Sequence, residues 1–268
     1  RNLMPGFSEY NSLISRDECY IKGTEILTPK GWKKIEDVKQ DEEVIGFKEG
    51  VSKVEKVEKV ISKVYDGELI NFKNQSHECI VTPNHDMITY NLGFKKYEKI
   101  KAKDLKLNHT KSIPHKIDFE NISDCKLTNI DRLKLALQAD GTNSKWTSKE
   151  GIVLNRGING GYTHSINLTK DKKIERLDLL LNSENIKYHK LKKNKKNSVY
   201  NINFEYNFDC KDLSWIFNKN LTKSLCKEII EEVVLWDGHI RKNNEKSVIY
   251  CSTDKRNIDI IQAVAVLA

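Results

Sequence analysis

Two short stretches of the chain contain the residue types of nucleophilic catalysis. Cys19 begins the first stretch, and Thr82-Pro-Asn-His85 forms the second. A free thiol has an ordinary pKa of about 8.5, so an oriented cysteine is a competent nucleophile at neutral pH. A histidine can give a proton to a leaving nitrogen, and a threonine hydroxyl can hold a peptide by hydrogen bonding. Cys19, Thr82 and His85 are therefore candidates for chemistry at an amide bond.

The sequence around Cys19 resembles the N-terminal splicing half of an intein. Members of that family open with Cys or Ser, continue with Thr-x-Ile-x-Thr-x-x-Gly and later contain Thr-x-x-His, and residues 24–31 of this chain match the middle pattern. The resemblance implies that Cys19 attacks the carbonyl carbon of Glu18 and converts the amide into a thioester. It also implies that His85 is the general acid, that Thr82 holds the peptide, and that splicing needs no cofactor.

One departure from the intein pattern lies at Lys39-Gln40-Asp41, where that family usually has a Gly-Asp turn. Secreted autoprocessing domains of the hedgehog type share the intein fold and its Cys/Thr/His chemistry, so they are an alternative. No secretory signal is visible, and we expect a cytoplasmic protein. The six cysteines form no CxxC pair, which favours reduced thiols over a disulfide framework or a zinc site.

Two aspartates each close an apolar helical pattern. Asp140-Gly141 follows an apolar run that begins at Leu133, and Asp237-Gly238 follows a second such run. Paired carboxylates suit a hard cation such as Mg²⁺, because that ion prefers oxygen ligands. Each Asp-Gly pair taken alone would also fit an ordinary solvated turn at the end of a helix.

The two acidic helix ends resemble the two LAGLIDADG motifs of homing endonucleases, which inteins often carry as an insertion. The second copy keeps only Asp237-Gly238 and the apolar helix before it. The resemblance implies that two helices pack side by side, with Ala136 and Ala139 permitting close approach. It further implies that Asp140 and Asp237 together hold Mg²⁺ above the minor groove and support hydrolysis of double-stranded DNA at the insertion site of the host gene.

The charge of the chain favours a polyanionic partner. The net charge is +8, from 46 Lys and Arg against 38 Asp and Glu. A basic run connects two expected strands, and in the homing endonuclease family such strands form a saddle in the major groove. The resemblance therefore implies phosphate contacts from Lys187, Lys190, Lys192, Lys193, Lys195 and Lys196. A solvated hairpin tip is the alternative for any single one of these lysines.

Residues 1–18 have a helical period, with Phe7, Tyr10, Ile14 and Glu18 on one face. This stretch resembles the small (beta) subunit of class I ribonucleotide reductase, just before the second Glu-x-x-His motif of its di-iron centre. The resemblance implies a host protein interrupted by the intein, with Glu18 as an iron ligand. Its partner after splicing would be the large subunit of the reductase.

The elements that must position these residues differ along the chain. Glycines and prolines separate short Val/Ile/Tyr-rich runs over residues 19–118, which is typical of an all-β region. Residues 119–268 contain no proline and alternate helical with strand-like patterns. We expect helices over 131–140, 173–184, 223–236 and 257–267, and strands over 43–47, 51–60, 67–72, 79–81, 186–191 and 200–206.

The predicted fold class is a mixed α/β multi-domain protein. An all-β Hint-type splicing domain, represented by its N-terminal half, precedes an α+β LAGLIDADG endonuclease of αββαββα order with a truncated second subdomain. The expected boundaries are 1–18 for the N-extein helix, 19–118 for the splicing region, 119–222 for the first nuclease subdomain and 223–268 for the second.

Splicing would also require partners, namely the C-terminal intein half and the C-extein, so we expect the 268 residues alone to be incomplete for splicing. Two further alternatives remain at this point. One is a reductase fragment that carries a degenerate, inactive insertion, and the other is a basic DNA-binding protein without chemistry. No run of eighteen apolar residues occurs, which argues against a membrane span.

Overall fold

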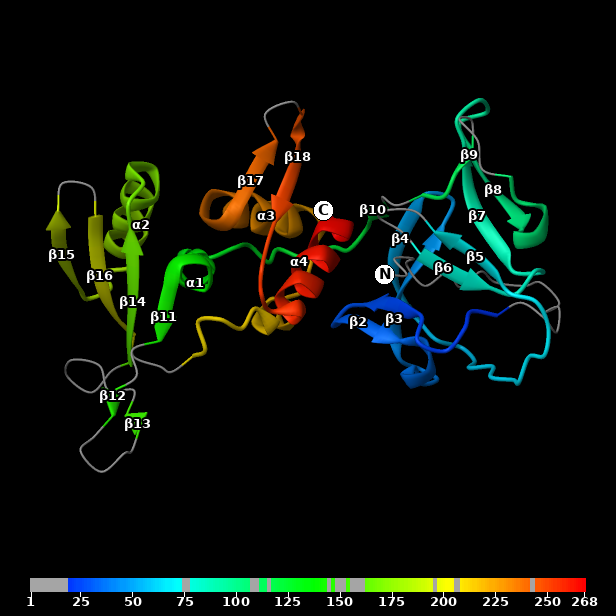
Figure 1. The fold of residues 1–268 in the computed structure, drawn as a ribbon, viewed down its shortest axis with the longest axis horizontal. Coiled ribbons are helices and arrows are strands. Elements are labelled where there is room, and N and C mark those ends of the chain that lie inside the picture. The colour runs from blue at the N-terminus through cyan, green and yellow to red at the C-terminus, as the bar shows by residue number, and fades with distance from the viewer. Residues whose placement is uncertain are drawn as a thin grey trace. The chain divides into compact units, whose positions relative to one another are not determined.

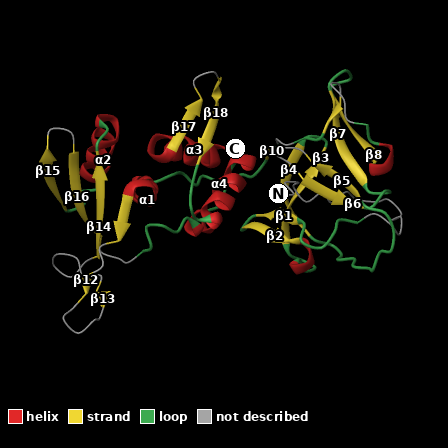
Figure 2. Cartoon of the chain, viewed as in Figure 1, coloured by secondary structure: helices red, strands yellow, loops and turns green. Residues whose placement is uncertain are grey.

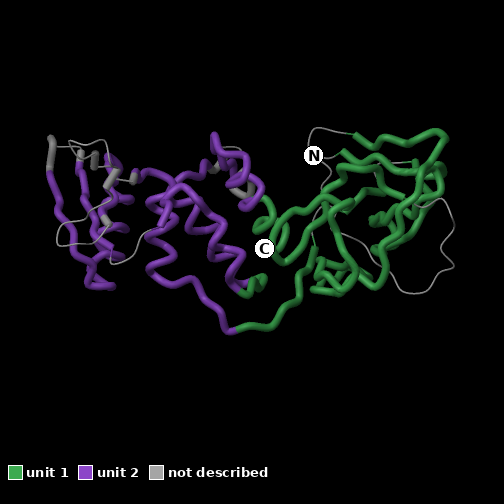
Figure 3. The backbone as a smooth tube through the Cα atoms, turned by 90° about the horizontal axis from the view of Figure 1, so that it is seen from below, with its two compact units in different colours: residues 1–123, 220–223, 262–268 green, residues 124–219, 224–261 purple. Residues whose placement is uncertain are grey.

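The computed structural model describes residues 19–268 except 74–77, 107–110, 115–116, 144–145, 148–152, 155–161, 195–196, 205–207 and 242–243. The chain divides into two compact units (Figure 3). The first unit contains residues 1–123, 220–223 and 262–268, and the second contains residues 124–219 and 224–261. The helix predicted over residues 1–18 lies outside the described residues. Among the described helices, none has the length and apolar character that a membrane span requires.

Strands dominate the first unit, as the spacing of glycine and proline predicts (Figure 2). They form two antiparallel hairpins and two three-stranded sheets (Figure 1). The strands are β1 (Glu25–Thr28) with β2 (Gly31–Lys34), β5 (Ile70–Lys73) with β6 (Glu78–Val81), β3 (Glu43–Lys48) with β4 (Val51–Lys56) and β10 (Asp118–Phe119), and β7 (Asp86–Asn91) with β8 (Lys96–Lys101) and β9 (Lys111–Ser112). Two short 3-10 turns, η1 (Ile35–Asp37) and η2 (Ala102–Asp104), connect strands.

Backbone conformation explains two of the turns in the first unit. Gly50 has a φ of +96°, and a Cβ there would lie 2.7 Å from a ring carbon of Tyr97, so the β3–β4 hairpin requires glycine. Asp41 has a φ of +64°, a left-handed conformation that Asp tolerates better than most residues. Its backbone N–H donates to the carbonyl of Val57 at 2.8 Å. The departure at Lys39-Gln40-Asp41 from the family's Gly-Asp pattern thus still allows a turn.

The strand predicted over 51–60 is only partly confirmed. β4 ends at Lys56, and the described residues that follow it up to β5 belong to no helix or strand. Val51 and Val54 are half-buried within β4, whereas Val60 lies beyond the end of the strand and is 46% exposed, so the three-residue spacing of valines does not mark one continuous element. β-branched content identified the strand, and pairing with β3 determines where it ends.

The second unit alternates helices and strands, and the predicted helices and strands there are confirmed with small shifts at their ends. The elements are α1 (Asn129–Asp140), β11 (Gly141–Asn143), β12 (Trp146–Thr147), β13 (Val153–Leu154), β14 (Tyr162–Leu168), α2 (Asp171–Ser183), β15 (Tyr188–Asn194), β16 (Asn197–Phe204), η4 (Ser214–Asn218), α3 (Lys223–Asp237), β17 (Gly238–Arg241), β18 (Asn244–Tyr250) and the first half of α4 (Lys255–Leu267), whose residues from 262 onward belong to the first unit. The antiparallel sheet has the order β11-β14-β16-β15 (Figure 1). The mixed α/β class is therefore confirmed.

Local chemistry defines both ends of α1. The Thr128 hydroxyl accepts the N–H of Asp131 at 3.2 Å, and the Asp131 carboxylate accepts the N–H of Thr128 at 2.9 Å, which forms a capping box. Such a cap contributes on the order of 1 kcal/mol. At the other end, a Cβ on Gly141 would lie 2.6 Å from the carbonyl oxygen of Leu137, so β11 can leave the helix directly only from a glycine. Asp140 is thereby fixed at the junction of α1 and β11.

Candidate functional sites

Cys19 and Thr82 bind each other through both backbone and side chain. The Cys19 N–H donates to Thr82 Oγ1 at 2.9 Å, and the Thr82 N–H donates to the Cys19 carbonyl at 3.0 Å. The next residue pair, Tyr20 and Val81, forms an antiparallel bridge. Thr82 is buried at 2% exposure, whereas Cys19 is half-buried. The nitrogen of the Glu18–Cys19 amide is therefore held by the threonine that the sequence singles out.

His85 lies in the turn that follows Thr82. Its backbone N–H donates to the Thr82 carbonyl at 3.0 Å, and its carbonyl accepts the N–H of Ala102 at 2.8 Å. The imidazole ring lies edge-to-face against the ring of Tyr20, with centroids 4.3 Å apart. Tyr20 in turn packs on the core that contains Val81 and Ala102. The structure thus brings Cys19, Thr82 and His85 into one part of the first unit.

A backbone hydrogen bond to a threonine hydroxyl orients the amide at Cys19, and a histidine ring on the neighbouring tyrosine can supply a proton donor. These are the groups that an attack by the Cys19 thiol would need. Glu18, whose carbonyl carbon would be attacked, lies outside the described residues, as do His77, His109 and His115.

The ends of α1 and α3 contribute the two aspartates of the second unit. Asp237 has a raised pKa, first because burial disfavours its charged form and second because the charge of Asp140 acts on it. Lys173 and Lys211 act in the opposite direction and limit the rise. Asp237 thus shares its charged surroundings with Asp140, which itself pairs with Lys173. A Cβ on Gly238 would lie 2.5 Å from the Cα of Val234, so the α3–β17 junction needs glycine for the same reason as the α1–β11 junction.

Two lysines flank this acid pair, and the sequence analysis did not identify either of them. Lys173, in the first turn of α2, forms an ion pair with Asp140. Lys211 belongs to the segment between β16 and η4. Its ammonium reaches the C-terminal end of α1 and donates to the carbonyl of Gln138 at 2.6 Å. A cation at this position satisfies helix carbonyls that have no partner within the helix. Nothing in the local sequence marks these two among 46 basic residues, because the contacts are long-range.

The chemistry of the acid pair fits a divalent cation. Within the part of the chain that the structure describes, no group of three or more His, Cys, Asp and Glu side chains could hold a metal. Mg²⁺ is commonly held by one or two carboxylates while water and substrate phosphates complete its shell, so two aspartates suffice. A cation would also favour the charged form of Asp237, whose pKa is raised first by burial and second by the charge of Asp140.

The sheet of the second unit has one apolar and one polar face. Ile166, Leu168, Tyr200 and Ile202 are buried on the face that bears α1 and α2. Because side chains alternate along a strand, the residues between them point to the other face. There the Ser165 hydroxyl donates to Asn201 Oδ1 at 2.7 Å, and the Thr163 hydroxyl donates to Asn203 Oδ1 at 3.2 Å.

This polar face carries Ser, Thr and Asn side chains, which can both donate and accept hydrogen bonds. The sequence pattern pointed only to the lysines for DNA contact, and this face was not predicted. The alternation of Thr163, Ser165 and Asn167 with His164, Ile166 and Leu168 was the signal available in the sequence.

The basic run is placed differently from its expected position between two strands. Residues 188–194 form β15 itself, so most of the run lies in an edge strand rather than in a connection. Lys190 pairs with Asp178 of α2 at 2.6 Å, and its ammonium lies 4.9 Å from the ring centroid of Tyr200. Lys187 is exposed. Lys192 and Lys193 belong to β15 but their side chains are not described, and Lys195 and Lys196 lie outside the described residues.

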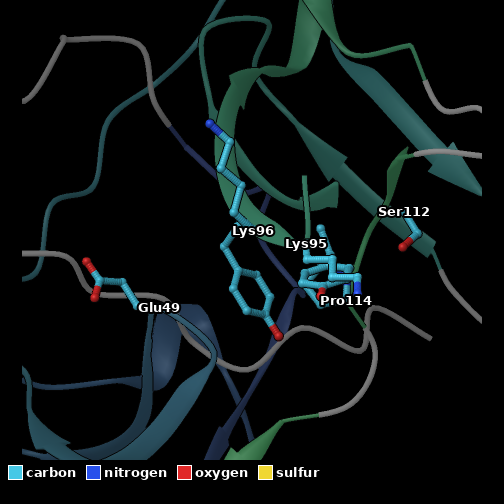
Figure 4. A pocket seen from close by; sticks show the side chains of 7 residues that line it. Glu49, Lys95, Lys96, Ser112 and Pro114 are labelled. Atoms are coloured by element: carbon cyan, nitrogen blue, oxygen red, sulfur yellow. The ribbon is translucent and has the colours of Figure 1, made fainter. Parts of the chain in front are cut away.

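A separate cavity of about 700 Å³ opens on the first unit (Figure 4). Its walls are Glu49, Tyr90, Lys95, Lys96, Tyr97, Ser112 and Pro114. The predicted catalytic residues of the first unit do not line it, so the cavity is distinct from the Cys19 site.

No family model matches the chain. It is 28% identical over 291 residues to the ribonucleoside-diphosphate reductase subunit beta of Aquifex aeolicus (strain VF5). The match covers 95% of this chain and 40% of that protein, so the chain spans less than half the length of this curated relative. Because the aligned region covers 95% of this chain, it is not limited to residues 1–18 and includes residues of both units.

Solved structures of the homing endonuclease I-DmoI resemble part of the chain. The structure of I-DmoI in complex with DNA and manganese is 15% identical, covers 51% of this chain and 75% of its own, and has a TM-score of 0.32. An I-DmoI variant with its target DNA is 14% identical, covers 50% of this chain and 71% of its own, and has the same TM-score. Likeness at this level is too weak to support an argument about the function of this chain.

Proposed function

We propose that the chain is part of an intein with an embedded homing endonuclease, inserted in the small (beta) subunit of a ribonucleotide reductase. On this proposal residues 1–18 are host sequence, 19–118 belong to the splicing domain, and 119–222 and 223–268 belong to two nuclease subdomains. The observation that carries the splicing activity is the reciprocal hydrogen bonding between Cys19 and Thr82. The match to a reductase subunit across 95% of the chain supports the host.

The first chemical step follows from that contact. The Cys19 sulfur attacks the carbonyl carbon of Glu18, a C–S bond forms, and the C–N bond to Cys19 breaks. The amide nitrogen leaves as an amine and takes up a proton, which His85 donates, while the thiol loses its own proton to solvent water, from which the imidazole is reprotonated. Thr82 holds the departing nitrogen through its hydroxyl oxygen at 2.9 Å. The products are a thioester and the free amino group of Cys19.

For the nuclease activity, Asp140 and Asp237 would hold Mg²⁺. The ion would supply Lewis acidity and lower the pKa of bound water. Lys173 and Lys211 keep positive charge beside the carboxylates, where a phosphate diester would approach. The polar face with Ser165 and the basic strand β15 would contact bases and phosphates of double-stranded DNA, respectively. For the host, Glu18 would be an iron ligand of a di-iron centre in a subunit that binds the reductase large subunit.

The splicing proposal is tested on the full-length gene product treated with dithiothreitol. A thioester at Cys19 predicts release of the sequence that ends at Glu18, detected by mass spectrometry. Cys19→Ala should abolish the release and His85→Ala should slow it. Release that persists in Cys19→Ala would remove Cys19 as the nucleophile.

The nuclease proposal is tested with a plasmid that carries the uninterrupted reductase gene of the same source. We expect the full-length product to cut it in Mg²⁺ near the codons for residues 18 and 19, and to leave the interrupted gene intact. Splicing without cutting would identify an insertion whose nuclease has lost activity. Cutting of both genes alike would contradict a homing function.

A further inference from the structure

One carboxylate of the second unit is almost fully buried, although it carries a charge. The Glu232 side chain, on α3, is 1% exposed. Arg132 of α1 donates to Glu232 Oε2 at 2.6 Å, and Arg176 of α2 donates to the same atom at 2.6 Å and to Oε1 at 3.2 Å. The indole N–H of Trp236 donates to Oε1 at 2.9 Å. A single carboxylate therefore links three helices.

These contacts compensate the cost of burial. Burial alone would raise the pKa of Glu232, but the hydrogen bonds from Arg176, Arg132 and Trp236 outweigh it and the pKa is lowered. The neighbouring buried positions of α3 are mostly apolar, among them Ile229 and Val233. An apolar residue at position 232 would suit that face at no electrostatic cost, since buried ion clusters are often no more stable than apolar packing. Stability alone therefore does not account for this cluster.

The cluster lies N-terminal to the acid pair on both α1 and α3. Asp140 follows Arg132 on α1 by about two turns, and Asp237 follows Glu232 on α3 by about one and a half turns. A slide of α3 along α1 by a single residue would shift Asp237 relative to Asp140 by about 1.5 Å. Apolar packing is not directional, whereas the Arg132 guanidinium of α1 spans two carboxylates of α3, donating to Glu232 Oε2 at 2.6 Å and to Glu228 Oε2 at 3.1 Å, and a planar fork held at two points admits only one alignment.

We propose that Arg132, Glu232 and Arg176 fix the register of α1 and α3 and thereby position the Asp140–Asp237 pair. This role rests on the proposed nuclease function, in which both carboxylates must face one site. The three residues touch neither the DNA nor the metal in this role. They are positioning residues.

The decisive variant replaces the cluster by apolar residues: Arg132→Met, Arg176→Met and Glu232→Met together. Because apolar replacement of a buried ion cluster is often neutral or stabilising, the Tm should not fall. Double-strand cutting should nevertheless fall by about tenfold or more, because the two aspartates are no longer aligned on both scissile phosphates. Nicked plasmid, in which only one DNA strand is cut, should accumulate. Unchanged double-strand cutting in this variant would overturn the proposal.

A matched control removes an ion pair that does not join α1 to α3. Lys219 binds the buried carboxylate of Asp131 at 2.8 Å, near the start of α1. Lys219→Met should lower the Tm and leave the ratio of nicked to linear product unchanged. If Lys219→Met raises that ratio as much as the apolar variant does, general destabilisation explains the result and the positioning role is wrong.

A second readout does not depend on nuclease activity. Genetically encoded spin labels at the exposed positions Thr142 and Leu235 report the distance between the end of α1 and α3. The apolar variant should broaden or shift that distance, and an unchanged distance would overturn the proposal. If the wild-type protein does not cut DNA, the nuclease function fails, while the distance still decides the positioning role.

If the apolar variant does not fold, Arg132→Lys decides the question. Lysine keeps the charge but replaces the fork by a point donor, so the distance distribution should broaden in a folded protein. An unchanged distribution in Arg132→Lys would overturn the proposal.

Discussion

The Cys19 site and the acid pair solve the problem of bringing distant residues together in different ways. In the first unit, Cys19 and Thr82 are held by main-chain and hydroxyl hydrogen bonds within paired extended segments. In the second unit, Asp140 and Asp237 stand at the ends of separate helices among charged neighbours. The first arrangement depends on hydrogen bonds, which act over short distances and only in particular directions. The second depends on electrostatic balance over a larger neighbourhood.

This difference determines what disturbs each site. A hydrogen-bonded site fails when one donor or acceptor is removed, and it is insensitive to salt. A charged site responds to pH, to ionic strength and to residues that never touch the reacting atoms. The two activities should therefore be separable by single substitutions, and each site should have its own pattern of sensitivity.

The largest effect is expected from Asp140→Asn. If Asp140 holds Mg²⁺ as proposed, its loss removes about 4 kcal/mol of transition-state stabilisation, which corresponds to about a thousandfold slower DNA cutting. Release of the N-terminal peptide by dithiothreitol should be unchanged, because that chemistry belongs to the first unit. Plasmid linearisation and mass spectrometry measure the two activities on one preparation.

Asp178→Asn is the matched control for that substitution. Asp178 is also an aspartate of the second unit with a lysine partner, but it lies on α2 with Lys190 and Tyr200. It should keep the cutting rate close to that of the wild type. An Asp140→Asn protein that still cuts in Mg²⁺ would show that the acid pair has been misplaced.

The next largest effect is expected from Thr82→Val, which should slow peptide release and leave DNA cutting intact. Valine keeps the shape of threonine but leaves the Cys19 N–H without its acceptor, at a cost of about 1–3 kcal/mol, or roughly ten- to a hundredfold slower thioester formation. DNA cutting should stay unchanged. The rate of peptide release in dithiothreitol measures the effect.

Thr89→Val provides the comparison for stability. Thr89 is likewise a buried threonine of the first unit, and its hydroxyl donates to the carbonyl of Glu98 at 3.3 Å. We expect a comparable loss of Tm with no change in release. If Thr82→Val also releases the peptide at the wild-type rate, the contact with Cys19 is structural.

The sequence could predict the first site and only half of the second. Cys19 and Thr82 are separated by 63 positions, and they were expected to act together with His85 only because both motifs resemble those of inteins. The acidic residues could be recognised as helix ends. Lys173 and Lys211 could not be predicted, since neither lies in a motif with a recognisable pattern and their contacts with α1 are formed only in the folded unit. In the sequence, Glu232 looks like an ordinary charged residue on the solvent side of a helix. Its burial is compatible with its charge because Arg132 and Arg176 form ion pairs with it.

The same distinction applies to the fold. Hydrophobic periodicity and glycine spacing predicted the helices α1 to α4 and six of the strands, namely β3, β4, β5, β6, β15 and β16, because these signals are local. The parallel pairing of β10 with β4 was not predictable, since it joins Asp118 and Phe119 to a strand far earlier in the chain. The course of residues 57–69 also has no local signal, and its valines suggest regular structure that the described residues do not form.

A smaller effect distinguishes the buried charges of the second unit by their response to pH. The raised pKa of Asp237 means that its ionisation opposes folding, a penalty absent below the ordinary pKa and complete above the raised one. Asp237→Asn should therefore raise the Tm at neutral pH and lose that advantage in acid. The lowered pKa of Glu232 has the opposite consequence: its stabilisation is complete above the ordinary pKa and is lost as pH falls through the lowered one.

Glu232→Gln should accordingly lower the Tm at neutral pH, with a deficit that shrinks in acid. Thermal unfolding from pH 3 to pH 8 (a range that brackets the roughly 4 of ordinary carboxyls) measures both variants. Curves that shift in the same direction for Asp237→Asn and Glu232→Gln would show that burial, and not the surrounding charges, dominates the two sites.

The smallest effect concerns two lysines of the basic run that look equivalent in the sequence: Lys187, just before β15, and Lys190, within it. Lys187 is exposed, whereas Lys190 has its charge compensated by Asp178 at 2.6 Å. Lys187→Met should therefore reduce the slope of log Kd against log salt by roughly 0.9, the value for one lost phosphate contact. Lys190→Met should leave the slope nearly unchanged. It should lower the Tm, because the Asp178 carboxylate loses its ion-pair partner and keeps only its hydrogen bond from Tyr200. Equal slopes for the two variants would mean that Lys190 leaves Asp178 when DNA binds, and the ion pair would then compete with DNA for the same lysine.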